Sequence, residues 1–343
     1  MTTRRPEQLR RRALASALGC LAATFGSPPA VLAQIREATA EEQPADADAF
    51  AAVRKGLTDR WTDVESVAVV LQGRTLFDFY RDGAPDRLRN VQSVEKSALS
   101  ALVGVALTQG VIASVDQPVV ALVPEWAPLN ADPRAAAITV RHLLTMSAGF
   151  GSGSATAVTG KLPPEQAWAR PLAAPPGERF VYDNPTLALI AALLERVSGM
   201  RLPDYARREL VGPLGLAEPG YQGPLQLRTH DMAKLGQLFL QQGRWGDRQI
   251  LPRDYVLDAT RPQNAGGPPV AMPYGYLWWI VPTEALRRTF MASGYAGQMI
   301  WVHPPLDLVV AVTSTVSAES QRRGHALQML RGGLFAAAQA RHR

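Results

Sequence analysis

The stretch NVQSVEKSALSALVGVAL (Asn90–Leu107) carries an S-x-x-K spacing inside a segment that is apolar or small on nearly every face. The pattern predicts a buried helix from about Ser93 to Gln109, and residues three apart lie on one face of a helix. Burial lowers the pKa of a lysine amine, and a neutral amine can take the proton of a serine hydroxyl. We therefore expect Ser93 to be a nucleophile at a helix N-terminus, with Lys96 as its base.

A phenol that could work with this pair lies in the segment RFVYDNPTLALIAALLERVSG. Asn184 is a favourable N-cap residue and Pro185 suits the first helical position, which places Tyr182 on the loop before a helix. We expect a cationic lysine to help the phenol lose its proton, so that the two groups carry one proton to a leaving group. The alternatives are an ordinary half-buried Tyr182, an Asn184 that only caps its helix, and an N-cap Ser93 beside a solvated Lys96.

The rest of the chain predicts one sheet built from both ends of the sequence. SVAVVLQGRTLFDFY (66–80) has two apolar runs around QGR, which is typical of a hairpin. YGYLWWIV, GQMIWVHP and DLVVAVTST add strands near the C-terminus. We predict a linker over 34–50, a sheet domain of residues 51–115 plus 225–343, and a helical insert domain of residues 116–224.

The N-terminus resembles an export signal. MTTRRPEQLRRR is followed by the short apolar run ALASALGCLAATFG, and VLA (31–33) supplies small residues for cleavage after Ala33. A signal peptide of residues 1–33 predicts a periplasmic or secreted protein, and RRALA weakly resembles a twin-arginine signal. ALGC loosely resembles a lipobox, so membrane contact is expected only if Cys20 carries a lipid. Beyond residue 33 the chain holds no cysteine and shows no basic patch for nucleic acid.

Five segments together resemble the serine β-lactamase-related family, over roughly residues 50–335. They are SVEK, ITVRHLLTMSAGF, PPGERFVYDNPTLALIAALLERVSGM, QLRTHDMAKLGQLFLQQGRWGDRQIL and ASGYAGQMIWVHPPLDLVVAVTS. That family includes class C β-lactamases, D-alanyl-D-alanine carboxypeptidases, family VIII esterases and 6-aminohexanoate-dimer hydrolases. The resemblance implies an α+β fold, β-lactamase/transpeptidase-like, in which a mostly antiparallel sheet is flanked by helices beside a helical domain. It also implies that Ser93 is acylated, that Lys96 and Tyr182 move protons, and that Asn184 ends a Tyr-x-Asn box.

A third box distinguishes substrate classes in that family. Penicillin-recognising members carry Lys-Thr-Gly or His-x-Gly on an edge strand, where the cation binds a substrate carboxylate. The matching residues here are Ala292, Ser293 and Gly294, so alanine occupies the cationic position. The resemblance implies an oxyanion hole made by the N–H groups of Ser93 and Tyr295, with residues 293–295 also contacting substrate. TMSAG, where relatives often have THTSG, is a second departure.

Other catalytic classes lack their motifs. There is no G-x-S-x-G elbow, and the five histidines show no metal-ligand spacing, so no metal or other cofactor is expected. We expect an exported serine hydrolase that cleaves a small carboxylic ester or amide through a Ser93 acyl-enzyme. The alternatives are a D-alanyl-D-alanine peptidase or weak β-lactamase, and a catalytically silent protein that binds peptidoglycan or another protein. The oligomeric state stays open.

Overall fold

The computed structural model describes residues 35–151, 160–282 and 288–342. The predicted signal peptide, its cleavage site and Cys20 lie outside the described residues. None of the helices in the described ranges is both long and apolar enough to cross a membrane.

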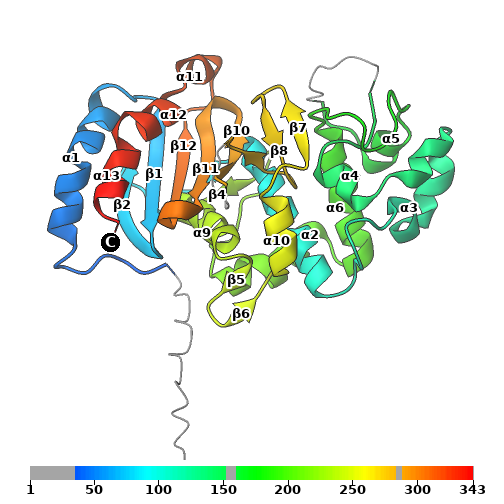
Figure 1. Cartoon of the computed structure of the whole chain (residues 1–343), viewed down its shortest axis with the longest axis horizontal. Coiled ribbons are helices and arrows are strands. Elements are labelled where there is room, and N and C mark those ends of the chain that lie inside the picture. Colours follow the sequence, from blue (N-terminus) through cyan, green and yellow to red (C-terminus); the bar gives the residue numbers. More distant parts are fainter. Residues whose placement is uncertain (1–34, 152–159, 283–287, 343) are drawn as a thin grey trace, which may run out of the picture. The chain divides into compact units, whose positions relative to one another are not determined.

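Eight strands of the described residues form one antiparallel sheet in the order β2-β1-β12-β11-β10-β9-β8-β7 (Figure 1). Their bounds are β1 (Val64–Leu71), β2 (Arg74–Tyr80), β7 (Asn264–Gly267), β8 (Met272–Tyr274), β9 (Trp279–Ile280), β10 (Phe290–Gly294), β11 (Gln298–His303) and β12 (Leu308–Ser314). The predicted 66–80 hairpin is confirmed, with a turn at Gln72 and Gly73. Short two-residue ladders join β3 (Arg89–Asn90) to β4 (Gln226–Leu227), and β5 (Arg244–Trp245) to β6 (Arg248–Gln249).

The α-helices of the described residues are mostly short, apart from four of twelve residues or more. Their bounds are α1 (Gln43–Asp59), α2 (Glu95–Thr108), α3 (Val119–Leu122), α4 (Val140–Leu144), α5 (Pro164–Trp168), α6 (Pro185–Ser198), α7 (Leu202–Ala206), α8 (Gly212–Leu214), α9 (Thr229–Leu240), α10 (Arg253–Ala259), α11 (Ala318–Arg323), α12 (His325–Met329) and α13 (Phe335–Ala340). The predicted linker 34–50 is therefore helical from Gln43 onward. The C-terminal helical segment is interrupted at Gly324, whose φ is 60°, and at Gly333.

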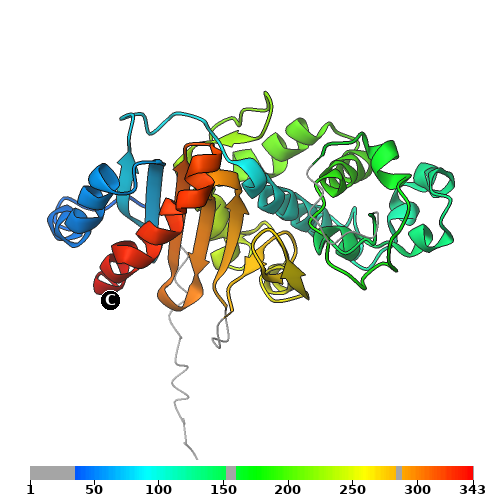
Figure 2. The same ribbon diagram turned by 90° about the horizontal axis from the view of Figure 1, so that it is seen from above.

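Helices cover both faces of the sheet, and Figure 2 shows α1 and α13 on the face opposite α9. The central strands β1 and β12 are rich in valine and buried on both faces, as a two-sided cover requires. Gly236 lets α9 approach closely, because a Cβ there would lie 2.7 Å from side-chain atoms of both Ile300 and Val309. This architecture confirms the predicted fold of a large antiparallel sheet flanked by helices.

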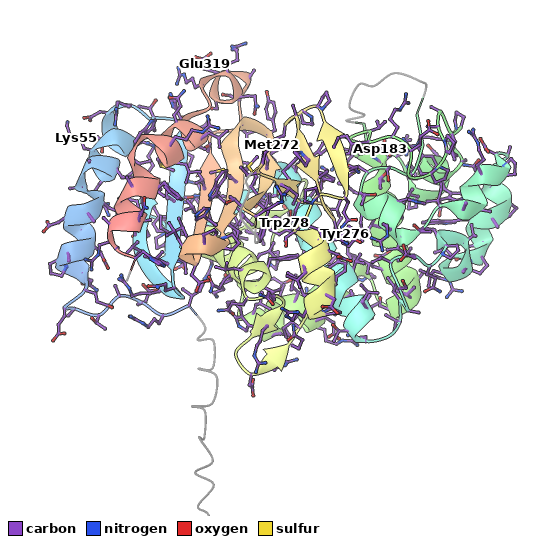
Figure 3. The ribbon with its side chains drawn as sticks, viewed as in Figure 1. Lys55, Asp183, Met272, Tyr276, Trp278 and Glu319 are labelled. Carbon is purple, nitrogen blue, oxygen red and sulfur yellow. The ribbon has the colours of Figure 1, made fainter. Side chains whose placement is uncertain are left out.

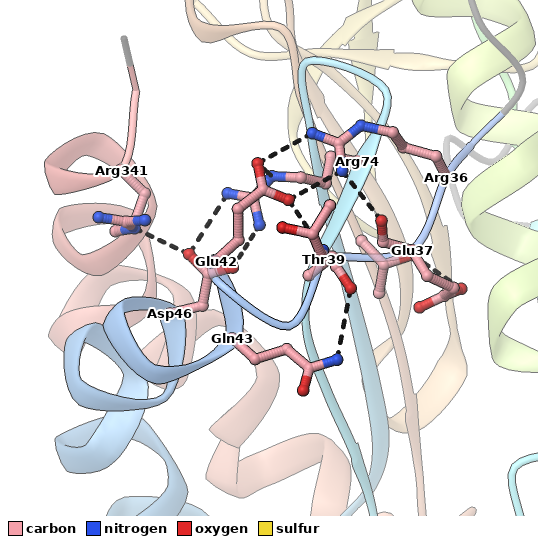
Figure 4. Close-up of polar contacts among 10 residues, drawn as sticks. Arg36, Glu37, Thr39, Glu42, Gln43, Asp46, Arg74 and Arg341 are labelled. Atoms are coloured by element: carbon pink, nitrogen blue, oxygen red, sulfur yellow. Dashed lines mark hydrogen bonds and ion pairs between the residues drawn. The ribbon is translucent and has the colours of Figure 1, made fainter.

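Ion pairs join the two ends of the described chain (Figure 4). Asp46 of α1 is buried and pairs with Arg74 of β2 and, at 2.8 Å, with Arg341 beyond α13. Arg36 binds Glu42 through two hydrogen bonds of 2.8 and 2.9 Å. Buried, hydrogen-bonded pairs are costly to break singly, so the two pairs of Asp46 hold α1 beside β2 and the C-terminal residues.

Candidate active site

Ser93 and Lys96 meet at the start of α2. The α-helix begins at Glu95 rather than at the predicted Ser93, which lies in the preceding 3₁₀ turn η1 (Gln92–Val94). The Asn90 side chain accepts the Gln92 N–H at 2.8 Å, and this bond shapes the turn. Lys96 Nζ donates to Ser93 Oγ at 2.9 Å, so the structure brings the two predicted residues together.

The Lys96 amine is almost removed from water, with 2% of the residue exposed. This burial lowers the pKa of Lys96 to about 8; the Glu95 carboxylate opposes the change and the Lys161 ammonium adds to it. A lysine with a pKa close to neutrality can act as a general base. The apolar surroundings of the 90–107 stretch therefore lower the Lys96 pKa, as expected.

Tyr182 lies on the loop before α6, as predicted, and packs against the same amine. Lys96 Nζ is 4.7 Å from the centroid of the Tyr182 ring. The same ring stacks on Trp279, with the two centroids 5.8 Å apart. The backbone N–H of Val181 donates to the carbonyl of Met146 at 2.9 Å and fixes the loop. This last contact brings the TMSAG segment next to the phenol.

The expectation that Tyr182 loses its proton easily is wrong. Burial raises the pKa of Tyr182 to about 12, and a hydrogen bond with Ser93 only partly opposes this change. Desolvation disfavours the phenolate more than the surrounding groups stabilise it. The Tyr182 phenol therefore stays protonated at neutral pH, and the Lys96 amine is the more easily deprotonated of the two groups.

The third box lies at the end of β10, which contacts η1 and thereby approaches Ser93. Ala292 is buried in the strand, and Tyr295 follows it in the 3₁₀ turn η5 (Tyr295–Gly297) with 45% of its surface exposed. A Cβ on Gly294 would lie 2.7 Å from the carbonyl oxygen of Val91, so only glycine lets the two segments come this close. The contact places the box beside the serine turn.

The sequence of this chain is similar to those of known proteins. The beta-lactamase family model matches residues 49–230, which is more than half of the chain. The chain belongs to the beta-lactamase family. The sequence is also 25% identical over 346 residues to 6-aminohexanoate-dimer hydrolase of Paenarthrobacter ureafaciens, covering 88% of this chain and 86% of that protein.

Solved structures of beta-lactamase-like proteins have the same fold. A penicillin-binding protein homolog from Caulobacter crescentus matches with a TM-score of 0.68 and 17% identity, covering 84% of this chain and 98% of the other. EstCE1, a hydrolase with promiscuous acyltransferase activity, matches with a TM-score of 0.67 and 18% identity, covering 87% and 100%. Family and relatives together indicate a hydrolase of the beta-lactamase superfamily.

Asn184 does not cap its helix, contrary to one alternative drawn from the sequence. It occupies the N-cap position of α6, yet its side chain makes no capping bond. Asp183 serves the turn instead, because the Thr186 hydroxyl donates to its carboxylate at 2.5 Å. Asn184 lines an apolar cavity.

The sequence did not single out three groups around the site of this beta-lactamase-family protein. Asp183 is buried among the helical segments in Figure 3 and binds Arg170 through two hydrogen bonds of 2.8 and 2.7 Å, which anchors the Tyr182 loop. Glu95 and Lys161 adjust the Lys96 pKa in opposite directions. The adjacency of Glu95 to Lys96 is visible in the sequence, whereas the other two contacts join distant segments.

His142 forms a capping box with Thr139 at the start of α4. Among the described residues, no group of three or more His, Cys, Asp or Glu side chains is arranged to hold a metal ion. Trp278 and Trp279 are both buried, and of the two it is Trp279 that stacks on Tyr182.

Proposed function

We propose that this protein is a serine hydrolase that cleaves a carboxylic ester or small amide through an acyl-enzyme on Ser93. The observation that carries the proposal is the 2.9 Å contact between Lys96 Nζ, which is buried, and Ser93 Oγ. The neutral amine takes the hydroxyl proton while Oγ forms a bond to the substrate carbonyl carbon. The N–H groups of Ser93 and Tyr295 hold the oxyanion that forms.

The intermediate then collapses and the bond to the leaving group breaks. The Lys96 ammonium returns the proton to the departing alcohol or amine, with the Tyr182 phenol as the relay. In the second step, water gives one proton to Lys96 while its oxygen bonds to the acyl carbon. The bond between that carbon and Ser93 Oγ then breaks, Lys96 returns the proton to Oγ, and the carboxylic acid leaves. Two groups with well-separated pKa values, about 8 and about 12, suit the base and donor roles in these steps.

The third box supports esters and simple amides over β-lactams. The buried alanine at position 292 provides no cation for a substrate carboxylate, which removes a charge-assisted bond of about 1.5–3 kcal/mol. One relative is named for an amide, the 6-aminohexanoate dimer, and EstCE1 is described as a hydrolase with acyltransferase activity. Both names favour an acyl-transfer reaction on non-lactam substrates.

The test combines a chromogenic short-chain ester, a chromogenic cephalosporin and a fluorophosphonate probe. We expect ester turnover, little cephalosporin turnover, and a phosphonyl adduct that mass spectrometry locates on Ser93. Ser93→Ala should abolish labelling and turnover, whereas Ser114→Ala, a change at an exposed serine, should preserve both. Cephalosporin turnover alone would favour the peptidase or β-lactamase alternative, and inertness to all three reagents would favour a silent binding protein.

We also propose that the protein is exported, on the strength of the signal-like residues 1–33. Expression of the full chain in a Gram-negative host, followed by fractionation and N-terminal sequencing, tests this. If Gln34 is the first residue of the periplasmic protein, cleavage after Ala33 is supported. A lipid adduct on Cys20 would instead show that the protein is anchored to the membrane.

A further inference from the structure

An apolar cavity of about 370 Å³ adjoins the proposed catalytic residues. Helix α2 contributes Leu99 and Leu102 to its wall, and α6 contributes Ala188 and Ala191. The far wall comes from the segment that includes α7 and from Leu235 of α9. Aliphatic side chains thus dominate the lining of this cavity.

Polar groups gather where the cavity meets the site. Glu95 and Asn184 line it, and they lie two residues from Ser93 and Tyr182 respectively. Lys161 also lines it and is close enough for its charge to act on the Lys96 amine. The cavity therefore lies near the catalytic residues, although its lining does not include Ser93, Lys96 or Tyr182 themselves.

The size and lining fit a hydrocarbon chain. Ligand pockets in proteins are commonly about 300–1,000 Å³ and mostly apolar, with a few polar groups that orient the ligand. An apolar cavity of about 150 Å³ holds benzene, so the present volume accommodates roughly eight to twelve aliphatic carbons. Two faces built of leucine and alanine offer such a chain neither hydrogen bonds nor charge.

The order of steps decides which part of a substrate belongs there. The alcohol or amine must leave before water can reach the acyl-enzyme. The leaving group is therefore best placed on the side of the site that is open to solvent. The acyl chain stays attached to Ser93 through both steps and suits an apolar cavity beside the site.

We propose that this cavity binds the aliphatic acyl chain of the substrate, so that the enzyme prefers medium-chain acyl groups to acetyl. The proposal rests on the proposed function, since it assigns the substrate class of the same site. Each methylene buried stabilises the bound state enough to raise kcat/KM by up to about fourfold.

The experiment compares 4-nitrophenyl acetate, butanoate and octanoate below their aggregation limits. We expect kcat/KM to be at least about 30-fold higher for octanoate than for acetate, given six added methylenes. Ala191→Phe should fill the cavity and lower the octanoate-to-acetate ratio at least about tenfold. Ala52→Phe, at an exposed position on α1, is the matched control and should leave the ratio unchanged.

A binding measurement separates this proposal from the catalytic one. Ser93→Ala protein should bind decanoate in calorimetry, and Ser93→Ala/Ala191→Phe protein should not. Ester hydrolysis with equal rates for acetate and octanoate, and no decanoate binding, would overturn the cavity proposal and leave the hydrolase intact. Decanoate binding without any ester hydrolysis would remove the proposed reaction and support the cavity as an aliphatic site.

Discussion

Gly294 at the end of β10 touches the backbone that leads into the nucleophile turn: a Cβ there would lie 2.7 Å from the Val91 carbonyl oxygen. Atoms of the backbone cannot swing away as a flexible side chain does. The glycine thus sets the distance between the third box and Ser93. A side-chain atom added at Gly294 must therefore displace either the end of β10 or the backbone at Val91.

Gly294→Ala is expected to lower kcat about 10²–10³-fold, because displacement of Tyr295 removes one oxyanion donor. Overpacking should also reduce the free energy of unfolding by about 1–3 kcal/mol. Ester kinetics and urea unfolding measure the two effects. Gly160→Ala is the control, because a Cβ there meets no atom within 4 Å; equal behaviour of the two variants would contradict the contact.

The pH dependence of kcat/KM should report the Lys96 amine. Its pKa of about 8 predicts that activity rises with pH through this value as the amine loses its proton. Glu95→Gln removes a charge that raises the Lys96 pKa, so the rising limb should move to lower pH. Lys161→Ala removes a charge that lowers it, so the limb should move to higher pH. Shifts in the same direction for both variants would show that another group controls the limb.

Lys96→Met should abolish activity and stabilise the fold at pH 7. The Lys96 pKa is lowered from 10.5 to about 8, so between these values the unfolded chain binds more protons than the folded one. Stability of the unsubstituted protein must then rise with pH across that window, by roughly 3 kcal/mol relative to Lys96→Met. Urea unfolding of both proteins at about pH 7 and pH 10.5 checks the sign, with Lys55→Met, on exposed α1, as the control. If the difference in free energy of unfolding between the two proteins were the same at both pH values, Lys96 would be solvated.

Tyr182→Phe should lower kcat about 10²–10⁴-fold, because the proton relay is lost. The melting temperature should change little, since the stack on Trp279 is kept. Tyr205→Phe removes another phenol, which donates to Gln109 at 3.0 Å away from the site, and should retain activity. Full activity of Tyr182→Phe would assign both proton transfers to Lys96 alone.

Local patterns were sufficient to predict the contact between Ser93 and Lys96 and much of the sheet. Three-residue spacing on a helix places Ser93 beside Lys96 whatever the rest of the chain does, and the apolar run around them predicts the burial that lowers the Lys96 pKa. The hairpin at 66–80 follows equally from two apolar runs of strand length on either side of QGR. Helix and strand periodicity are properties of neighbours in sequence, so they can be read without coordinates.

Tertiary structure decided what depends on distant segments. The Tyr182 pKa rises because several elements together exclude water from the phenol, an effect that a neighbouring lysine could not predict. The Arg170–Asp183 pair, the influence of Lys161 and the close approach of Gly294 to Val91 each join parts of the chain that no short pattern connects. Desolvation and packing depend on the atoms that fill the space around a group, and the fold alone determines which atoms these are.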